Sequence, residues 1–555
     1  MSKRQQHSFL EGAAILVIAT ALSKIIGAVF KIPLNNIIGD LGFGYYSSAY
    51  DLFVPIYGIS LTGLPMVVSR MVAERVAEGR YLSAKRVFKV SVIAFTAFGA
   101  VMTALMLLLI KPFLALTDMT GATYYSLLAV APAWLFCCVM SAYTGYYEGY
   151  GNMYPTAWAN VIEALSKLVF GYTFAYVAVK KSANVAHAAA AAILGVTIGV
   201  FLATLFTFIY YKVKGDNAKQ ITNENVEPKR EILKSIALLA VPIVLSSFVT
   251  NMTTFIDLIT VKWQLGNLMG ESFEHIKAMY GASIDEYNAT AHELLTVENM
   301  PTFLYGVRSK TNTIYNLVPS IVSVLGISAL PSLVHVWCKE AHKQDEVKNC
   351  INSVLKVTSI ITFPAAIGMI AVAPNIMSLL YESHASVEIG APLLRIYGVA
   401  AIFSGLSVPL VNMLQAVGKP YLPVRNMLIG AALKAALNIG LVAVPNINVH
   451  GAAYGTLGCF LCIFVLNFYS LCKITGVKPE VWGTLIKPLF AALICGAAAL
   501  LCSTLLGLGT LKTLLSIAVA AVIYFVLLFA FSVLKIEDVL KSPILNKPKS
   551  CKNSH

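Results

Sequence analysis

Long apolar segments recur along almost the whole chain, and they limit the possible folds more than any other feature. A segment of about 20 apolar residues is long enough to cross a bilayer as a helix. The chain is 58% hydrophobic and only 12% charged, which is more apolar surface than a soluble core can bury. We therefore expect an all-α polytopic membrane protein with about 14 transmembrane helices. The expected helices lie near residues 10–33, 45–74, 87–110, 122–147, 155–179, 185–211, 233–262, 303–336, 348–374, 391–416, 420–444, 450–472, 484–507 and 511–534.

Basic residues fall in alternate loops between these segments, and this asymmetry predicts the orientation of the chain. Cytoplasmic loops of membrane proteins are enriched in Lys and Arg. The net charge of +14 is therefore explained by loops on one side of a membrane, and it does not indicate nucleic-acid binding. Both termini are expected in the cytoplasm. The basic loops contain Lys3 and Arg4; Arg75, Arg80, Lys85 and Arg86; Lys212, Lys214, Lys219, Lys229 and Arg230; Lys339, Lys343 and Lys348; Lys473 and Lys478; and Lys541, Lys547, Lys549 and Lys552 in the tail.

The longest loop on the opposite side, residues 263–302, is acidic. Its length and polarity are compatible with a small amphipathic cap over the outer mouth of the protein. They are equally compatible with a mobile surface loop.

An internal repeat divides the chain into two similar halves. Tyr50-Asp51-Leu52 matches Tyr315-Asn316-Leu317, and Lys167 matches Lys434, at offsets between 264 and 267 residues. The repeat unit contains six expected helices, so both copies have the same orientation in the membrane. We expect two lobes that face each other across a central cavity. The expected parts are an N-lobe (1–212), a cytoplasmic linker (213–232), a C-lobe (233–472), two further helices (473–535) and a basic tail (536–555).

Polar residues inside the apolar segments are the candidates for function. A lysine at the centre of a spanning helix costs about 2.5–3.5 kcal/mol. Lys24 and Lys31 are seven residues apart, so they share one helix face with Gly27. This face is interpreted as the wall of a water-filled cavity. The other candidates are Arg308, Asn312 and Asn316 near the eighth helix, Thr250, Thr254 and Asp257 in the seventh, Arg395 in the tenth and Lys434 in the eleventh.

Two of these assignments have structural alternatives. Glu163 and Lys167 are four residues apart on one helix, where a self-neutralising ion pair is the favoured interpretation. Arg308 is a candidate ligand, but it is also placed to pair with the acidic outer loop. If Lys24, Lys31 and Arg308 are free, the cavity is cationic and suits an anionic guest such as a sugar-linked pyrophosphate.

No pattern of catalytic residues is visible. The histidines lack metal-ligand spacing, and no phosphate-binding loop ending in Lys-Ser or Lys-Thr is present, so ATP hydrolysis is not expected. Cys459 and Cys462 have C-x-x-C spacing within an apolar segment, where helix packing is the favoured role. The chain is expected to be neither an enzyme nor a binder of an organic cofactor, and sodium or proton coupling stays open.

Three motifs resemble a known family. They are SKIIGAVFKIPLNNIIGD (residues 23–40), YYSSAYDLF (45–53) and GLPMVVSRMVAE (63–74). Together they are similar to the start of oligosaccharide-lipid flippases in the multidrug/oligosaccharidyl-lipid/polysaccharide (MOP) exporter superfamily, in the branch of stage V sporulation protein B and MurJ-type lipid II flippases. The resemblance implies that Lys24, Lys31 and Arg308 bind substrate. It also implies sodium binding at Asp257 with polar residues of the eleventh helix, where this chain has Lys434 and Asn438.

The resemblance implies a flippase in the bacterial cytoplasmic membrane. Its substrate would be an undecaprenyl-pyrophosphate-linked cell-wall precursor, lipid II or a related oligosaccharide lipid, moved by alternating access with membrane potential or an ion gradient as the drive. Membrane lipids surround such a protein, and cell-wall synthases are candidate partners. The alternatives are a cation-coupled drug exporter of the same superfamily, which needs acidic cavity residues, and a non-transporting scaffold for cell-wall synthesis.

Overall fold

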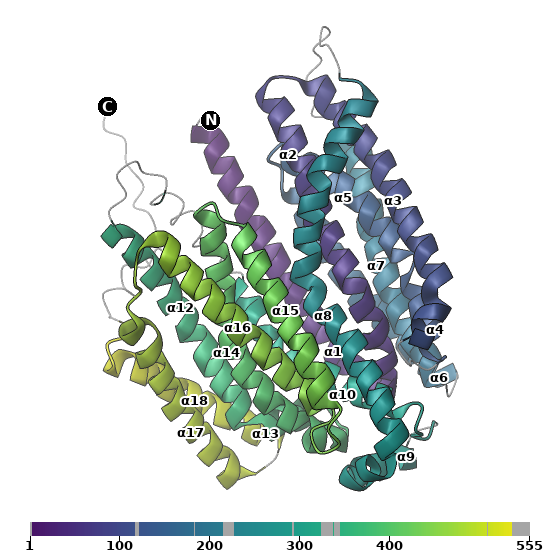
Figure 1. Cartoon of the computed structure of the whole chain (residues 1–555), viewed down its shortest axis with the longest axis vertical. Coiled ribbons are helices and arrows are strands. Elements are labelled where there is room, and N and C mark those ends of the chain that lie inside the picture. The colour runs from purple at the N-terminus through teal and green to yellow at the C-terminus, as the bar shows by residue number, and fades with distance from the viewer. Residues whose placement is uncertain are drawn as a thin grey trace.

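The computed structural model describes residues 3–116, 121–181, 184–214, 227–290, 293–323, 337, 344–507 and 509–534. Within these ranges the chain forms helices and no strands. Most of the helices run along the long axis of the molecule (Figure 1). An all-helical chain satisfies every backbone N–H and C=O group internally, which the bilayer interior requires.

The described ranges contain 11 helices that are long and apolar enough to cross a membrane. The chain is therefore a multi-pass membrane protein, as expected. The first of these candidates, Ile15–Ala77, contains two of the expected spans. Two more expected spans, 303–336 and 420–444, are absent from the set; the first lies partly outside the described ranges, and both carry polar residues. The count of 14 stays a prediction.

The first two expected spans both lie in α1 (Lys3–Gly58), which consists of two helices that meet at a kink at Gly39, beside Asp40. The break expected between them is therefore present, but it is a sharp kink without a longer loop. At Gly39 φ is 69°, a left-handed conformation that glycine adopts without strain. α1 then passes through a π-helical turn, η1 (Ile59–Gly63), into α2 (Leu64–Ala77). Pro65 lies in the first turn of α2 and has no N–H to donate to the preceding turn, where the carbonyl of Ser60 accepts a hydrogen bond from Ser141 Oγ.

The N-lobe consists of the helices up to α7. A Cβ atom on Gly195 of α7 would lie 2.3 Å from Gly171 Cα of α6, so these two helices approach so closely that only glycine fits. Helix α1, which carries Lys24 and Lys31 on one face, packs against α6. The remaining helices of the lobe are α3 (Tyr81–Leu116), α4 (Thr123–Val130), α5 (Ala133–Gly149), α6 (Tyr154–Lys181) and α7 (Val185–Lys214).

The C-lobe is built around α14, which packs against α12 and α16. The last two helices, α17 and α18, form a pair that contacts the rest of the lobe through α12. The elements of this half are α8 (Lys229–Met279), α9 (Gly281–Thr290), α10 (Met300–Tyr315), α12 (Gln344–Ala371), α13 (Ala373–Leu380), η2 (Ser386–Gly390), α14 (Ala391–Ala416), α15 (Tyr421–Val442), α16 (His450–Thr475), η3 (Trp482–Ile486), α17 (Lys487–Leu506) and α18 (Thr510–Ala530).

Helix α8 contacts both lobes. Ile232 and Ile236 in its first turns belong to a hydrophobic cluster with α2, α3 and α5, whereas its later turns pack against α15. Just before α8, Glu227 Oε2 accepts a hydrogen bond from Arg75 at 2.5 Å, and Oε1 accepts one from Arg80 at 2.6 Å. Partial burial acts to raise the pKa of Glu227, but the hydrogen bonds and charges of Arg75 and Arg80 outweigh it and hold the pKa below its ordinary value.

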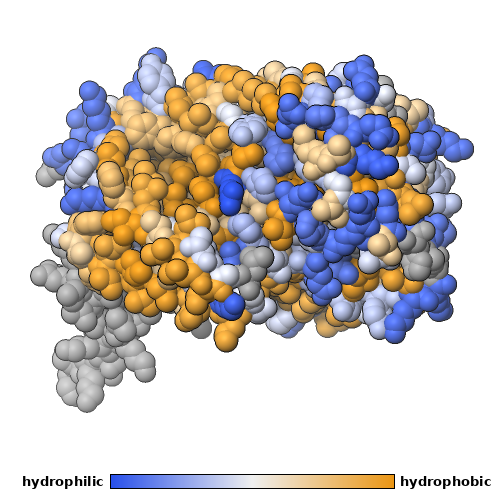
Figure 2. Space-filling view, turned by 90° about the horizontal axis from the view of Figure 1, so that it is seen from below, coloured by the Kyte–Doolittle hydropathy of each residue, from blue (hydrophilic) through white to orange (hydrophobic). Residues whose placement is uncertain are grey.

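The acidic segment 263–302 is largely helical. α8 continues to Met279 with a break at Ser272, and α9 follows. α9 lies at the end of the molecule opposite the start of α1 (Figure 1). Seen from that end, hydrophilic residues gather on the side of α9, and hydrophobic residues dominate on the side of α17 and α18 (Figure 2). The helices fit the expected cap, and their position over an outer mouth stays a prediction.

Candidate functional site

Two adjoining pockets lie between the lobes. The first has a volume of about 290 Å³ and is lined by α1 and α6 of the N-lobe and by residues at and after the end of α10. The second, of about 310 Å³, is lined mainly by α8, α10 and α15 of the C-lobe. Lys24, Asn316 and Ser320 line both pockets. We treat the two as one space, the central cavity.

Lys24 and Lys31 both line the central cavity, on the helix face expected from their spacing. Lys24 Nζ donates a hydrogen bond to Ser323 Oγ at 2.9 Å, which connects α1 to the helical residues after α10. Lys31 Nζ lies 4.6 Å from the ring centre of Tyr50, a distance that allows a cation–π interaction. Among the described residues, neither lysine has a carboxylate oxygen within 4.0 Å. Their positive charges are therefore available to a ligand.

Lys167 also lines the cavity, and its expected ion pair with Glu163 is not formed among the described residues. Tyr57 OH donates to Glu163 Oε1 and Oε2, both at 2.8 Å. Lys167 Nζ points instead to the ring of Tyr50, 5.6 Å from its centre. The direct ion pair is therefore absent, although the charge of Lys167 still acts on Glu163, and the N-lobe wall carries a third lysine.

The C-lobe side of the cavity holds a buried charge cluster centred on Asp257 of α8. Lys434 Nζ donates to Asp257 Oδ2 at 2.7 Å, and Asn438 Nδ2 donates to Oδ1 at 2.9 Å. Arg308 Nη2 forms a second ion pair with Oδ2. Arg308 is 1% exposed and lines neither pocket.

This cluster changes three of the expectations. Arg308 and Lys434, expected as free cations, are both paired with Asp257. Within the described ranges, Arg308 does not pair with the acidic outer segment, which was its alternative expected partner. Asp257, expected as an ion-coupling residue, is occupied by two cationic side chains. Such a carboxylate has little negative charge left to attract a sodium ion.

The remaining candidates divide into two groups. Asn312, Asn316 and Thr254 line the C-lobe part of the cavity, as expected. Arg395 is exposed on α14 and lines neither pocket, so its placement in the cavity is wrong. The side chain of Thr250 lies outside the described residues.

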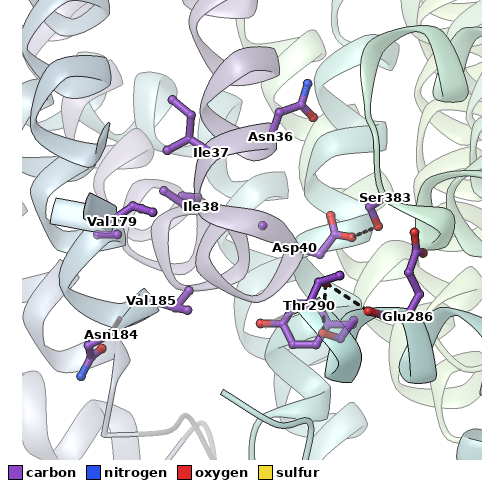
Figure 3. Close-up of a pocket in the computed structure, with 13 residues that line it drawn as sticks. Asn36, Ile37, Ile38, Asp40, Val179, Asn184, Val185, Glu286, Thr290 and Ser383 are labelled. Carbon is purple, nitrogen blue, oxygen red and sulfur yellow. Dashed lines mark hydrogen bonds between the residues drawn. The ribbon is translucent and has the colours of Figure 1, made fainter. Parts of the chain in front are cut away.

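A second buried ion pair was missed by the sequence analysis. Lys310 Nζ of α10 donates to Asp40 Oδ1 at 2.5 Å and to Ser386 Oγ at 2.7 Å. Ser383 donates to Asp40 Oδ2 at 2.5 Å (Figure 3). The expected helices place Asp40 between the first two spans, in a loop where water can solvate a carboxylate that has no protein partner. The available signal was Lys310 itself, a lysine inside an expected membrane helix.

These contacts close the cavity at the end where α9 lies. Asp40 belongs to α1 and Lys310 to α10, and both are no more than 1% exposed, so the pair joins the lobes. Asn36 Nδ2 adds a hydrogen bond to Leu380 O at 3.1 Å. Lys24 and Lys31 precede this closure along α1, so the cavity lies between the closure and the end where α1 begins. On the far side is a pocket of about 340 Å³, lined by Asn36, Asp40 and Glu286 among others (Figure 3).

The described residues offer no group of three or more His, Cys, Asp or Glu side chains that could hold a metal ion. The cavity instead offers ammonium and amide groups, together with the carboxylates of Glu163 and Asp257. Ammonium and amide groups act as hydrogen-bond donors to anionic oxygens.

Two known families match different parts of the chain. Residues 9–283 match the family "Polysaccharide biosynthesis protein", and residues 309–528 match "Lipid II flippase MurJ". Among curated proteins of Bacillus subtilis, the membrane protein YabM is 24% identical over 92% of this chain and 87% of its own length. Stage V sporulation protein B is 23% identical over 98% of this chain and 99% of its own.

The fold is shared with a solved transporter structure. The structure of lipid II flippase MurJ in an inward closed conformation superposes with a TM-score of 0.70, covering 95% of this chain and 99% of that one at 14% identity. At this identity the similarity concerns the fold alone. It supports a polytopic helical membrane fold for this chain.

Proposed function

Because the chain belongs to the MOP exporter superfamily, in the branch of polysaccharide and lipid II flippases, we propose that it moves an undecaprenyl-pyrophosphate-linked cell-wall precursor across the cytoplasmic membrane of a bacterium. The substrate is lipid II or a related oligosaccharide lipid. One observation carries this proposal: Lys24 and Lys31 line a cavity between the lobes, with no carboxylate within 4.0 Å among the described residues. Unpaired lysines at membrane depth are costly unless a ligand uses them.

The pyrophosphate binds the two lysines, and the polyprenyl tail stays in the bilayer. Lysine ammonium groups bind phosphate oxygens as point charges, and a dry surrounding strengthens each contact. An apolar pocket of about 430 Å³ between α12, α17 and α18 offers a surface for part of the tail. The headgroup and the tail thus bind to separate surfaces of the protein.

Loading occurs at the end where α1 begins, which the basic loops assign to the cytoplasm. The Asp40–Lys310 pair closes the other end in this conformation. Release to the outer leaflet requires this closure to open and the lobes to close at the cytoplasmic end. In this proposal, a cavity closed at the α9 end accepts substrate from the cytoplasmic side.

Membrane potential is the proposed drive. The headgroup is an anion, and a membrane that is negative inside favours its outward movement by about 2.3 kcal/mol per charge per 100 mV. Sodium coupling at Asp257 would require an ion to displace Lys434 or Arg308 from the carboxylate. The arrangement of charges therefore favours potential over a sodium gradient.

The test is the appearance of lipid II at the outer leaflet in bacteria depleted of their own flippase and supplied with this protein. Wild type is expected to restore outer-leaflet lipid II, whereas Lys24→Ala and Lys31→Ala should each reduce it about tenfold, since each removes a charged hydrogen-bond donor. Lys180→Ala at the exposed end of α6 is the matched control and should behave like wild type.

The outcomes of this test decide between lipid II, another glycan and a drug as the substrate, and they test the headgroup site. Failure of well-expressed wild type to restore lipid II would exclude that substrate and lead to assays with other polyprenyl-linked glycans. Full activity of both cavity variants would contradict the assignment of the headgroup site. Export of cationic dyes that depends on Glu163 would favour the drug exporter instead.

A further inference from the structure

Lys167 of α6 reaches the same patch of the cavity wall as Lys24 and Lys31. A Cβ atom on Gly27 would lie 3.8 Å from Lys167 Nζ, and Gly27 lies between the other two lysines on one face of α1. The ammonium groups of Lys31 and Lys167 lie 4.6 and 5.6 Å from the centre of the same ring, that of Tyr50. Three lysines thus surround one glycine.

The nearest acidic side chain does not hold Lys167. Glu163 is one helical turn away, but the hydrogen bonds to its two oxygens come from Tyr57 at 2.8 Å. In the part of the chain that the structure describes, no carboxylate oxygen lies within 4.0 Å of Lys167 Nζ. With three lysines and Glu163, the N-lobe wall has a net positive charge.

In the other half of the internal repeat, the lysine at the matching position is neutralised by a carboxylate. Lys434 is the counterpart of Lys167, and α15 packs against α8 as α6 packs against α1. In the C-lobe, α8 presents Asp257 to Lys434 at 2.7 Å. In the N-lobe, α1 presents Gly27, which has no side chain. The group that faces the lysine therefore differs between the two halves.

We propose that Lys167 is a third phosphate-binding residue and that it makes the cavity select a polyprenyl diphosphate over a monophosphate. This inference rests on the proposed function. A diphosphate carries more charge and more oxygen atoms than a monophosphate, so a third ammonium group beside Lys24 and Lys31 stabilises the diphosphate more strongly. Gly27 keeps the space between the three ammonium groups free for the second phosphate.

The experiment measures binding of farnesyl diphosphate and farnesyl monophosphate to the purified full-length protein in detergent. Wild type is expected to bind the diphosphate at least about tenfold more tightly. Lys167→Gln should weaken diphosphate binding about tenfold and monophosphate binding much less, so that the preference is lost. Lys167→Arg keeps the charge and should retain most of the preference for the diphosphate. Its binding shows that the site still folds when this position is changed.

The double variant Glu163→Gln/Lys167→Gln shows whether Lys167 binds the phosphate or only balances the charge of Glu163. If Lys167 binds phosphate, the double variant remains defective; if Lys167 only balances Glu163, it binds like wild type, which would overturn the inference. An unchanged preference in Lys167→Gln would overturn it as well. Wild type that binds neither probe would reject the proposed function itself, whereas wild type that binds both equally would reject only the role of Lys167.

Discussion

Lys434 and Asp257 form an ion pair of 2.7 Å that connects α15 to α8 beside the central cavity. Arg308 pairs with the same carboxylate oxygen, and the side chains of all three residues are at most 4% exposed. The C-lobe wall therefore carries two cations and one anion in direct contact, while the N-lobe wall carries lysines without such a partner. This asymmetry between two repeated halves is the basis of the predictions below.

Removal of the shared carboxylate should destabilise the protein strongly. Asp257→Asn leaves Arg308 and Lys434 buried without a counter-charge, and breaking a buried ion pair in this way costs about 3–5 kcal/mol. We expect a clear fall in the melting temperature of the purified protein. Asp285→Asn on the exposed face of α9 is the matched control. An equal melting temperature for Asp257→Asn and the control would contradict the pairing.

The same cluster predicts how the protein responds to sodium. Replacing potassium with sodium at constant ionic strength should leave the melting temperature of wild type unchanged, since Lys434 and Arg308 occupy Asp257. Lys434→Gln frees one position on the carboxylate, and a sodium-dependent rise is expected in that variant. A sodium-dependent rise in wild type would show that the ion displaces a side chain, and it would restore Asp257 as a coupling site.

Loss of the Asp40–Lys310 pair should open the cavity at the α9 end. Lys310→Ala leaves Asp40 buried without its charge partner, so the closed conformation loses stability relative to the open one. A cysteine placed at Ser383 should then react several-fold faster with a membrane-impermeant maleimide added outside whole cells. The protein without the added cysteine provides the background. An unchanged rate would mean that the pair does not hold the lobes together.

The contact between Glu227 and two arginines predicts a pH dependence of stability. Partial burial opposes ionisation of Glu227, but Arg75 and Arg80 lower its pKa from the ordinary value of 4.5. A carboxyl whose pKa is lower in the folded state stabilises the fold above its unfolded pKa, and this contribution is lost as the pH falls through the folded pKa. Wild type should thus melt above Glu227→Gln at pH 7, and the difference should shrink below pH 4.5. A difference independent of pH would exclude the charge as its cause.

The pattern of apolar segments predicted the class of fold well. The helix face that carries Lys24 and Lys31 followed from their spacing alone, because a seven-residue separation is two turns of any helix. The break between the first two helices was also predicted correctly near the glycine-aspartate pair, where the chain turns at a kink at Gly39. Arg395 was misplaced because a charged residue in an apolar helix gives no indication of which neighbour covers it.

The sequence by itself determined which segments enter the membrane, how the two halves are repeated and which charges reach membrane depth, because these depend on local hydropathy and helical periodicity. Only the tertiary structure decided which of those charges are paired. Asp257 meets Lys434 across 177 residues of sequence, and Asp40 meets Lys310 across 270. Contacts of this kind depend on how helices pack, and they separate the neutralised cations of the C-lobe from the free lysines of the N-lobe.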